Sequence, residues 1–205
     1  MSYNIIAAEF ERSVPNFSQL QEGQALEVAF VGRSNVGKSS LLNALCNRRA
    51  LARTSRTPGR TQLLNFFRIE YRDREKKATS EYCYFVDLPG YGFARVAKKV
   101  RAAWEVTLHR YLLERETLAV VVLLIDCRRD PGEEEQFISK LGAEGGLILV
   151  LTKTDKLNRG QLEQRKREII GLLPVTPEAI FCTSLVGGKA RGIDELRTAI
   201  FERLQ

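Results

Sequence analysis

The 205-residue sequence contains little of what metal centres, disulfide scaffolds and membrane spans require. Its single histidine, His109, cannot build a zinc site, and its cysteines show neither CxxC nor Cys/His spacing. The cysteines are Cys46, Cys83, Cys127 and Cys182. We expect them to be reduced, small core residues in a cytoplasmic protein. The longest apolar run, residues 118–125, is far shorter than the about 18 residues that span a bilayer, and the first residues lack the basic-then-apolar order of a secretory leader. The sequence therefore predicts a soluble protein without a membrane partner.

The length and composition fit one domain with a short extension. A chain of this length buries about 70% of its unfolded surface, and 44% hydrophobic residues can fill that core. We place the extension at residues 1–24 and the domain at residues 25–205, and we expect a monomer.

Positive charge is concentrated in one segment. The net charge is +7, and residues 48–77 alone hold ten basic and three acidic side chains, which is the whole excess. A basic face indicates an anionic partner, and nucleic acid comes first because no amphipathic anchor or lipidation site points to a membrane. The alternative is a solvated loop rich in arginine.

Short apolar runs alternate with longer segments of helical spacing, which is the pattern of a parallel α/β fold. The predicted strands are residues 27–31, 63–71, 82–86, 119–125, 147–151 and 179–182. The predicted helices are residues 38–47, 98–114, 133–142, 161–172 and 193–204. The charged stretch at 72–77 is only long enough to turn a hairpin, so the second strand should run antiparallel. We therefore expect a six-stranded, mostly parallel sheet with one antiparallel strand and helices on both faces.

The first strand runs into GRSNVGKS, residues 32–39, and then into the helical pattern LLNAL. This is the P-loop pattern GxxxxGK[ST] in the strand, loop and helix context that it requires. Its glycines let backbone amides turn toward phosphates at a helix N-terminus. Lys38 supplies a cation to the β- and γ-phosphates, and Ser39 offers a hydroxyl to Mg²⁺. The segment predicts a nucleoside triphosphate site.

The third strand ends in DLPG, residues 87–90. This sequence places the Asp87 carboxylate beside the phosphate loop, where it would hold Mg²⁺ through water. The Gly90 amide can then meet the γ-phosphate. The pattern DxxG is common, but after an apolar strand downstream of a P-loop it is a strong signal.

The fifth strand ends in TKTD, residues 152–155. The Asp155 carboxylate can accept hydrogen bonds from the imino and amino groups of guanine, whereas adenine offers no such pair of donors. Lys153 would lie along the base. The backbone of residues 182–184, after the sixth strand, could close on the base from the other side.

Mg²⁺ and the γ-phosphate need one more ligand from a loop, and the candidate is TPGRTQ, residues 57–62, with Thr61 as its ligand. Because Thr61 lies in the basic segment, ordering of this loop around a triphosphate would reposition that surface. Nucleotide chemistry and partner binding would then be coupled.

The segments GRSNVGKSS, TSRTPGRTQLLNFF, DLPGYGFA and TKTDKL, in this order and spacing, resemble the EngB family, also called YihA or YsxC, of bacterial ribosome-assembly GTP-binding proteins. The resemblance covers nearly the whole chain and extends to the TrmE-Era-EngA-EngB-Septin-like GTPase superfamily. It implies a P-loop NTPase fold of the Ras-like GTPase kind, a three-layer sandwich. It also implies binding of GTP, GDP and Mg²⁺, slow GTP hydrolysis, assembly of the large ribosomal subunit with its rRNA as partner, and a link to cell division and septation.

The resemblance implies a set of nucleotide-binding residues, carried over motif by motif. They are Gly32, Arg33, Ser34, Asn35, Val36, Gly37, Lys38, Ser39, Gly59, Arg60, Thr61, Gln62, Leu63, Asp87, Leu88, Pro89, Gly90, Thr152, Lys153, Thr154, Asp155, Cys182, Thr183 and Ser184. Among them Lys38, Thr61 and Gly90 are the catalytic positions. Ser39 and Thr61 bind Mg²⁺ directly.

Three positions leave questions open. Thr152 stands where asparagine is commoner, so its contact to the phosphate loop is an open point. Tyr91 stands where many GTPases carry a water-orienting glutamine, and it cannot do that job in the same way. Asn35 matches a position that coordinates K⁺ in related GTPases, and the alternative is a side chain that only braces the loop.

Two other function classes stay open from the sequence. One is a nucleotide-dependent binding module or division scaffold with negligible turnover. The other is an ATPase with a degenerate base pocket.

Overall fold

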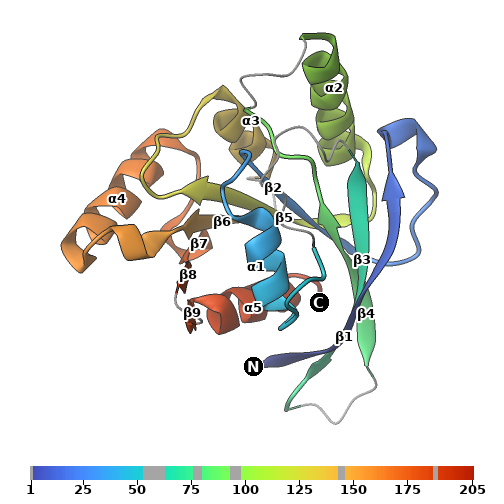
Figure 1. Ribbon diagram of the computed structural model, residues 1–205, viewed down its shortest axis with the longest axis horizontal. Coiled ribbons are helices and arrows are strands. Elements are labelled where there is room, and N and C mark those ends of the chain that lie inside the picture. The colour runs from blue at the N-terminus through green and yellow to red at the C-terminus, as the bar shows by residue number, and fades with distance from the viewer. Residues whose placement is uncertain (1, 53–62, 76–79, 93–97, 143–145, 187–188) are drawn as a thin grey trace.

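The computed structural model describes residues 2–52, 63–75, 80–92, 98–142, 146–186 and 189–205 (Figure 1). In these ranges no helix has both the length and the apolar character to traverse a bilayer. Cys46, Cys83 and Cys127 are buried and Cys182 is half-buried, and all four are free thiols.

A twisted seven-stranded sheet forms the centre of the molecule, with the strand order β1-β3-β4-β2-β5-β6-β7. Its strands are β1 (Tyr3–Val14), β2 (Glu27–Gly32), β3 (Leu64–Asp73), β4 (Glu81–Asp87), β5 (Leu118–Asp126), β6 (Leu147–Thr152) and β7 (Ile180–Cys182). Pairing is parallel from β4 through β2, β5 and β6 to β7, and antiparallel on both sides of β3. The predicted antiparallel strand is therefore confirmed. Every residue of β2 and β6 is buried, as expected for strands covered on both faces.

The sheet has seven strands where the sequence predicts six, because the N-terminal segment pairs along β3. Register shifts between Ile5 and Ala7 and between Phe10 and Arg12 mark two irregularities of the β-bulge kind in this pairing. Bulges break the period-two alternation of buried and exposed residues, which is the signal that identifies a strand in a sequence. A short hairpin of β8 (Ser184–Val186) and β9 (Lys189–Arg191) is a second addition.

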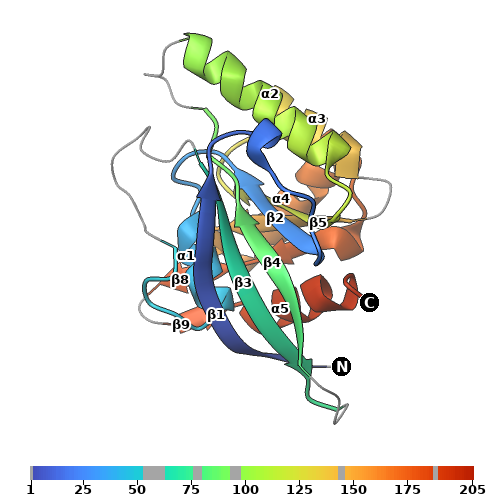
Figure 2. The same ribbon diagram turned by 90° about the vertical axis from the view of Figure 1, so that its right-hand side faces the viewer.

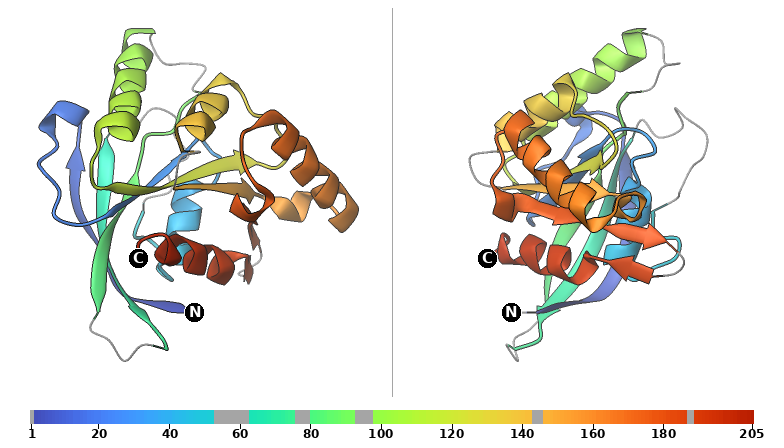
Figure 3. Two further views of the ribbon diagram at one scale, coloured as in Figure 1. Left: turned by 180° about the vertical axis from the view of Figure 1, so that it is seen from behind. Right: turned by 90° about the vertical axis from the view of Figure 1, so that its left-hand side faces the viewer.

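Helices cover both faces of the sheet, as predicted (Figures 2 and 3). They are α1 (Lys38–Leu45), α2 (Lys98–Glu114), α3 (Glu133–Gly142), α4 (Arg159–Leu172) and α5 (Ile193–Glu202). One hydrophobic cluster joins α1 and α5 to one face, and a second joins α2, α3 and α4 to the other. The ring centroids of Tyr3 and Phe201 lie 5.5 Å apart, so both termini lie on the same side of the molecule (Figure 1).

A buried carboxylate ties the amino end of β2 to its surroundings. Glu27 is fully buried and pairs with the guanidinium of Arg115, which follows α2. Its carboxylate also accepts hydrogen bonds from the hydroxyls of Tyr111 and Thr117, the latter at 2.9 Å. Arg115 donates a further bond to the carbonyl of Gln21 at 2.8 Å. The network joins β2, α2, β5 and the N-terminal segment at the end of β2 that lies away from the P-loop.

Replacement of Arg115 by alanine should lower the free energy of unfolding by about 3–5 kcal/mol, because it leaves the Glu27 carboxylate buried without its counter-charge. Chemical denaturation followed by circular dichroism measures this change. Glu114→Ala is the matched control, since it removes only an exposed ion pair with Arg110 and should leave the stability nearly unchanged. Equal effects of the two substitutions would contradict a structural role for the buried network.

Candidate nucleotide-binding site

The sequence motifs meet at one edge of the sheet. Strands β4, β2, β5, β6 and β7 are parallel, so their carboxyl ends lie together. The P-loop follows β2, and the DLPG segment begins at the last residue of β4. The TKTD segment begins at the last residue of β6, and residues 182–184 begin at the last residue of β7. Crevices at the carboxyl ends of parallel strands are the usual ligand sites of open α/β sheets.

The phosphate loop ends at a helix N-terminus that has no side-chain cap. Gly37 precedes α1 with φ of 110°, a conformation that favours glycine, and no side chain caps the helix there. The amides of the first helical turn are therefore available to a ligand. Amides in this position, together with the helix dipole, favour an anion such as a phosphate.

Lys38 and Asp87 form an ion pair within the site. Their side chains are only 12% and 8% exposed. The pair brings together the cation predicted for the phosphates and the carboxylate predicted for Mg²⁺.

The DLPG segment lies directly on the phosphate loop. A Cβ added to Gly90 would lie 3.2 Å from the Cα of Ser34, so a side chain at this position would press on the phosphate loop. The amide of Ser34 donates to the carbonyl of Tyr91 at 2.8 Å. The backbone around Gly90 is thus beside the loop that would hold phosphates.

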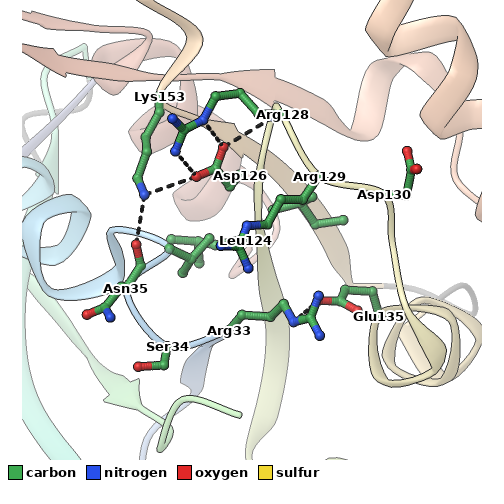
Figure 4. A pocket seen from close by; sticks show the side chains of 12 residues that line it. Arg33, Ser34, Asn35, Leu124, Asp126, Arg128, Arg129, Asp130, Glu135 and Lys153 are labelled. Carbon is green, nitrogen blue, oxygen red and sulfur yellow. Dashed lines mark hydrogen bonds and ion pairs between the residues drawn. The ribbon is translucent and has the colours of Figure 1, made fainter. Parts of the chain in front are cut away.

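Lys153 links the base side of the site to the phosphate loop. It adopts φ of 59°, its Nζ donates to the carbonyl of Asn35 at 2.8 Å, and the same atom lies 3.0 Å from the Asp126 carboxylate. The hydrogen bond from the Arg128 guanidinium holds the pKa of Asp126 well below its usual range, and Lys153 adds to this effect. These contacts fix the lysine stem along one wall of the site (Figure 4).

Asp155 is exposed and held in place by Ser184. The Ser184 hydroxyl donates to Asp155 Oδ1 at 3.0 Å, and Thr154 donates to the carbonyl of Thr183 through both its amide and its hydroxyl. Partial loss of contact with water acts to raise the pKa of Asp155. The hydrogen bonds from the Ser184 hydroxyl and Lys156 outweigh this effect, so the pKa of the carboxyl lies below its usual value. Residues 152–155 and 182–184 thus form one joined surface around an ionised carboxylate.

The structure answers two of the open points. The Thr152 hydroxyl donates to the carbonyl of Val36 at 2.8 Å, so threonine makes a side-chain contact to the phosphate loop. Tyr91 is buried, with only 3% of its surface exposed. Asn35 is exposed with φ of 62°, which leaves its K⁺ role a prediction.

Part of the predicted site lies outside the described ranges. This part comprises Gly59, Arg60, Thr61 and Gln62. The segment that leads to them is anchored, because the Asn43 side chain bonds the amide and the carbonyl of Ala52 at 2.8 and 2.9 Å. On the other side Leu63 is 38% exposed just before β3.

A pocket of about 120 Å³ opens beside the phosphate loop, on the side of α3 (Figure 4). Arg33, Arg128 and Lys153 line it together with the carboxylates of Asp126 and Glu135. Sequence reasoning missed Asp126 and Glu135, since neither belongs to a recognisable motif. The position of Asp126 at the end of an apolar strand is the signal that could have identified it.

Among the described residues, no cluster of three or more His, Cys, Asp and Glu side chains is arranged to hold a metal ion. Mg²⁺ in nucleotide sites needs no such cluster, because it keeps several waters and binds one or two protein groups plus phosphate oxygens. The Ser39 hydroxyl and the Asp87 carboxylate are oxygen donors of the kind that Mg²⁺ prefers.

Comparisons with known proteins show the family to which the chain belongs. A family model described as 50S ribosome-binding GTPase matches residues 27–153. A probable GTP-binding protein EngB from Syntrophus aciditrophicus is 43% identical over 203 residues, which cover 95% of this chain and 96% of that protein. The protein of the same name from Clostridium perfringens is 41% identical over 207 residues, with coverage of 98% and 97%.

Two solved structures share the fold. A crystal structure of a probable GTP-binding protein engB superposes with a TM-score of 0.64 at 23% identity, over 87% of this chain and 98% of that chain. Era in complex with MgGDPNP and nucleotides 1506–1542 of 16S ribosomal RNA superposes with a TM-score of 0.66 at 23% identity, over 87% of this chain and 56% of that chain. They confirm the P-loop GTPase fold.

The family model covers more than half of the chain, and relatives above 40% identity align with almost all of it. The chain belongs to the EngB family of GTP-binding proteins.

Proposed function

We propose that this protein binds GTP and GDP with Mg²⁺ at the edge formed by the carboxyl ends of the parallel strands, and that it hydrolyses GTP slowly. Two pairs of side chains at that edge carry the proposal. Lys38 forms an ion pair with Asp87, and Ser184 donates a hydrogen bond to Asp155. The first pair suits a triphosphate, and the second suits the two donors on the edge of guanine.

The chain's own groups have distinct tasks in this proposal. Lys38 exchanges the Asp87 carboxylate for phosphate oxygens, and the amides at the start of α1 hold the same phosphates. Ser39 and Thr61 would hold Mg²⁺ directly, and Asp87, once released from Lys38, would hold it through water. In this site Mg²⁺ would supply positive charge to the β- and γ-phosphates. The Gly90 amide meets the γ-phosphate.

The burial of Tyr91 supports slow hydrolysis, because the position after DxxG offers no side chain to orient the attacking water. K⁺ at Asn35 would supply charge between the phosphates in place of an arginine from a partner. Asn35 is exposed at the phosphate loop, which suits such a role.

The proposed partner is the large ribosomal subunit and its rRNA, with a role in subunit assembly and a link to cell division. The family description, a 50S ribosome-binding GTPase, supports the large subunit. The Era structure of the same fold, which holds a segment of 16S ribosomal RNA, supports rRNA as the kind of partner. The basic segment at residues 48–77 supplies the electrostatic requirement. Its first side chains, Arg48 and Arg49, are exposed.

Asp155→Asn tests the base site. The substitution should weaken GDP binding by about tenfold to a hundredfold, because it removes a charged acceptor for the donors on guanine. Affinity for xanthosine diphosphate should rise, since an amide can donate to the ring oxygen that replaces the amino group. Isothermal titration calorimetry with the two diphosphates measures both changes.

Asp194→Asn serves as the matched control, since Asp194 lies on α5 with an 88% exposed side chain. It should leave both affinities unchanged. An unaltered GDP affinity in Asp155→Asn would remove Asp155 from the base site.

Replacement of Arg48 and Arg49 by glutamine, alone and together with Arg53 and Arg56, tests the RNA surface. The variants should bind large-subunit particles more weakly, with a log–log salt slope smaller by about 0.7–0.9 for each phosphate that the protein no longer neutralises. GDP affinity should stay nearly constant. Sedimentation with separated subunits over a salt series, in the presence of a nonhydrolysable GTP analogue, measures the slope.

Arg159→Gln with Arg167→Gln on α4 is the control for net charge, since both side chains are exposed. Particle binding that falls equally in control and test variants would mean that no localised RNA surface exists at the basic segment. GTP turnover that rises with particles separates a GTPase from a scaffold with negligible turnover.

A further inference from the structure

The segment from Gly90 to Gly92 is joined to the phosphate loop through its backbone. Arg33 and Tyr91 form a parallel bridge outside the named strands. The Ser34 amide donates to the Tyr91 carbonyl at 2.8 Å, and the Tyr91 amide donates to the Gly32 carbonyl at 3.4 Å. The position of the Gly90 amide therefore depends on how firmly this bridge is held.

The Arg33 side chain ties the same bridge to α3. Its Nε lies 3.8 Å from Oε1 of Glu135, whose side chain is 2% exposed (Figure 4). The other carboxylate oxygen of Glu135 accepts a hydrogen bond from the Gly132 amide at 2.7 Å, which fixes the carboxylate in the first turn of α3. A Cβ at Gly92 would lie 3.1 Å from the Arg33 Nε, so the segment after Tyr91 also packs on this guanidinium.

Tyr91 is buried within the electrostatic reach of the same carboxylate. Burial, followed by the negative charge of Glu135, raises the pKa of the Tyr91 phenol well above its usual value, with Glu134 adding to the effect and Arg33 opposing it. Glu135 thus contacts a side chain of the phosphate loop, and its charge acts on a side chain of the segment after DLPG. Glu135 and Tyr91 lie outside the set of residues that we assign to the nucleotide, whereas Arg33 belongs to the phosphate loop.

We propose that Arg33, Glu135 and Tyr91 form a latch that holds residues 90–92 on the phosphate loop, and that the latch positions the Gly90 amide for the γ-phosphate. The three are positioning residues, and the inference rests on the proposed GTP-binding function. The latch organises the segment before the nucleotide arrives, so less conformational entropy is lost when the triphosphate binds.

This role predicts a loss that depends on the γ-phosphate. GDP has no γ-phosphate, so its binding uses the P-loop amides, Lys38 and the base site without the Gly90 amide. A nonhydrolysable GTP analogue uses all of these and Gly90 as well. General damage to the phosphate loop would weaken both ligands, whereas loss of the latch should weaken only the triphosphate.

Calorimetry with GDP and a nonhydrolysable GTP analogue, on wild type and on Glu135→Ala and Tyr91→Phe, provides the test. Each variant should lose about five- to tenfold in analogue affinity relative to GDP affinity. The double variant with both substitutions should lose less than the product of the two single losses, because both substitutions weaken the same latch.

Glu133→Ala is the matched control, because Glu133 is exposed in the same first turn of α3. It should leave the ratio of the two affinities unchanged. Circular dichroism identifies any variant that does not fold. Tyr91→Phe removes only a hydroxyl group, so it still tests the latch if Glu135→Ala does not fold.

Equal losses for both ligands, or no loss for either, would overturn the latch while leaving the proposed function in place. A wild-type protein that binds neither guanine nucleotide would overturn the proposed function, and the latch with it.

Discussion

Parallel pairing of β4, β2, β5, β6 and β7 is the constraint on which the site depends. It places the carboxyl ends of five strands at one edge, so that segments more than a hundred residues apart in the chain become neighbours. Register is strongly fixed here, because a slip of one residue would turn every side chain of β2 or β6 toward the opposite face. Both strands are buried on both faces. The buried Glu27 network fixes the other end of β2, which leaves the P-loop as a turn between a fixed strand and a fixed helix.

Several ion pairs lie at this edge within the described part of the chain. Lys38 pairs with Asp87, Lys153 with Asp126, and Arg33 with Glu135. These pairs should differ in what happens to them when a nucleotide binds. Under the proposed function, the first pair should exchange partners when phosphates and Mg²⁺ bind, whereas the second and third pairs should stay in place. A site with compensated charges stays folded without its ligand, and it can give up one ion pair for stronger contacts to phosphates.

Much of this arrangement could be predicted from the sequence, because each motif sits at the end of an apolar run. Lys38, Asp87 and Asp155 were assigned from motifs that follow the predicted strands. The N-terminal strand could not be predicted in the same way, since two register shifts disrupt its alternation. Glu135 carries no motif, and only the packing of α3 against the phosphate loop brings it to Arg33. The hydrogen bond from the Thr152 hydroxyl to the Val36 carbonyl could not be predicted either, because it depends on how closely the end of β6 approaches the phosphate loop.

The central claim is that this edge selects guanine nucleotides, and calorimetry of the wild-type protein with GDP, IDP and ADP tests it most directly. Asp155 should accept two hydrogen bonds from GDP and one from IDP, which lacks the amino group, and neither from ADP. We expect that GDP binds most tightly, that IDP is weaker, and that ADP is weaker than GDP by a factor on the order of a thousand or more. Comparable affinities for GDP and ADP would contradict the claim.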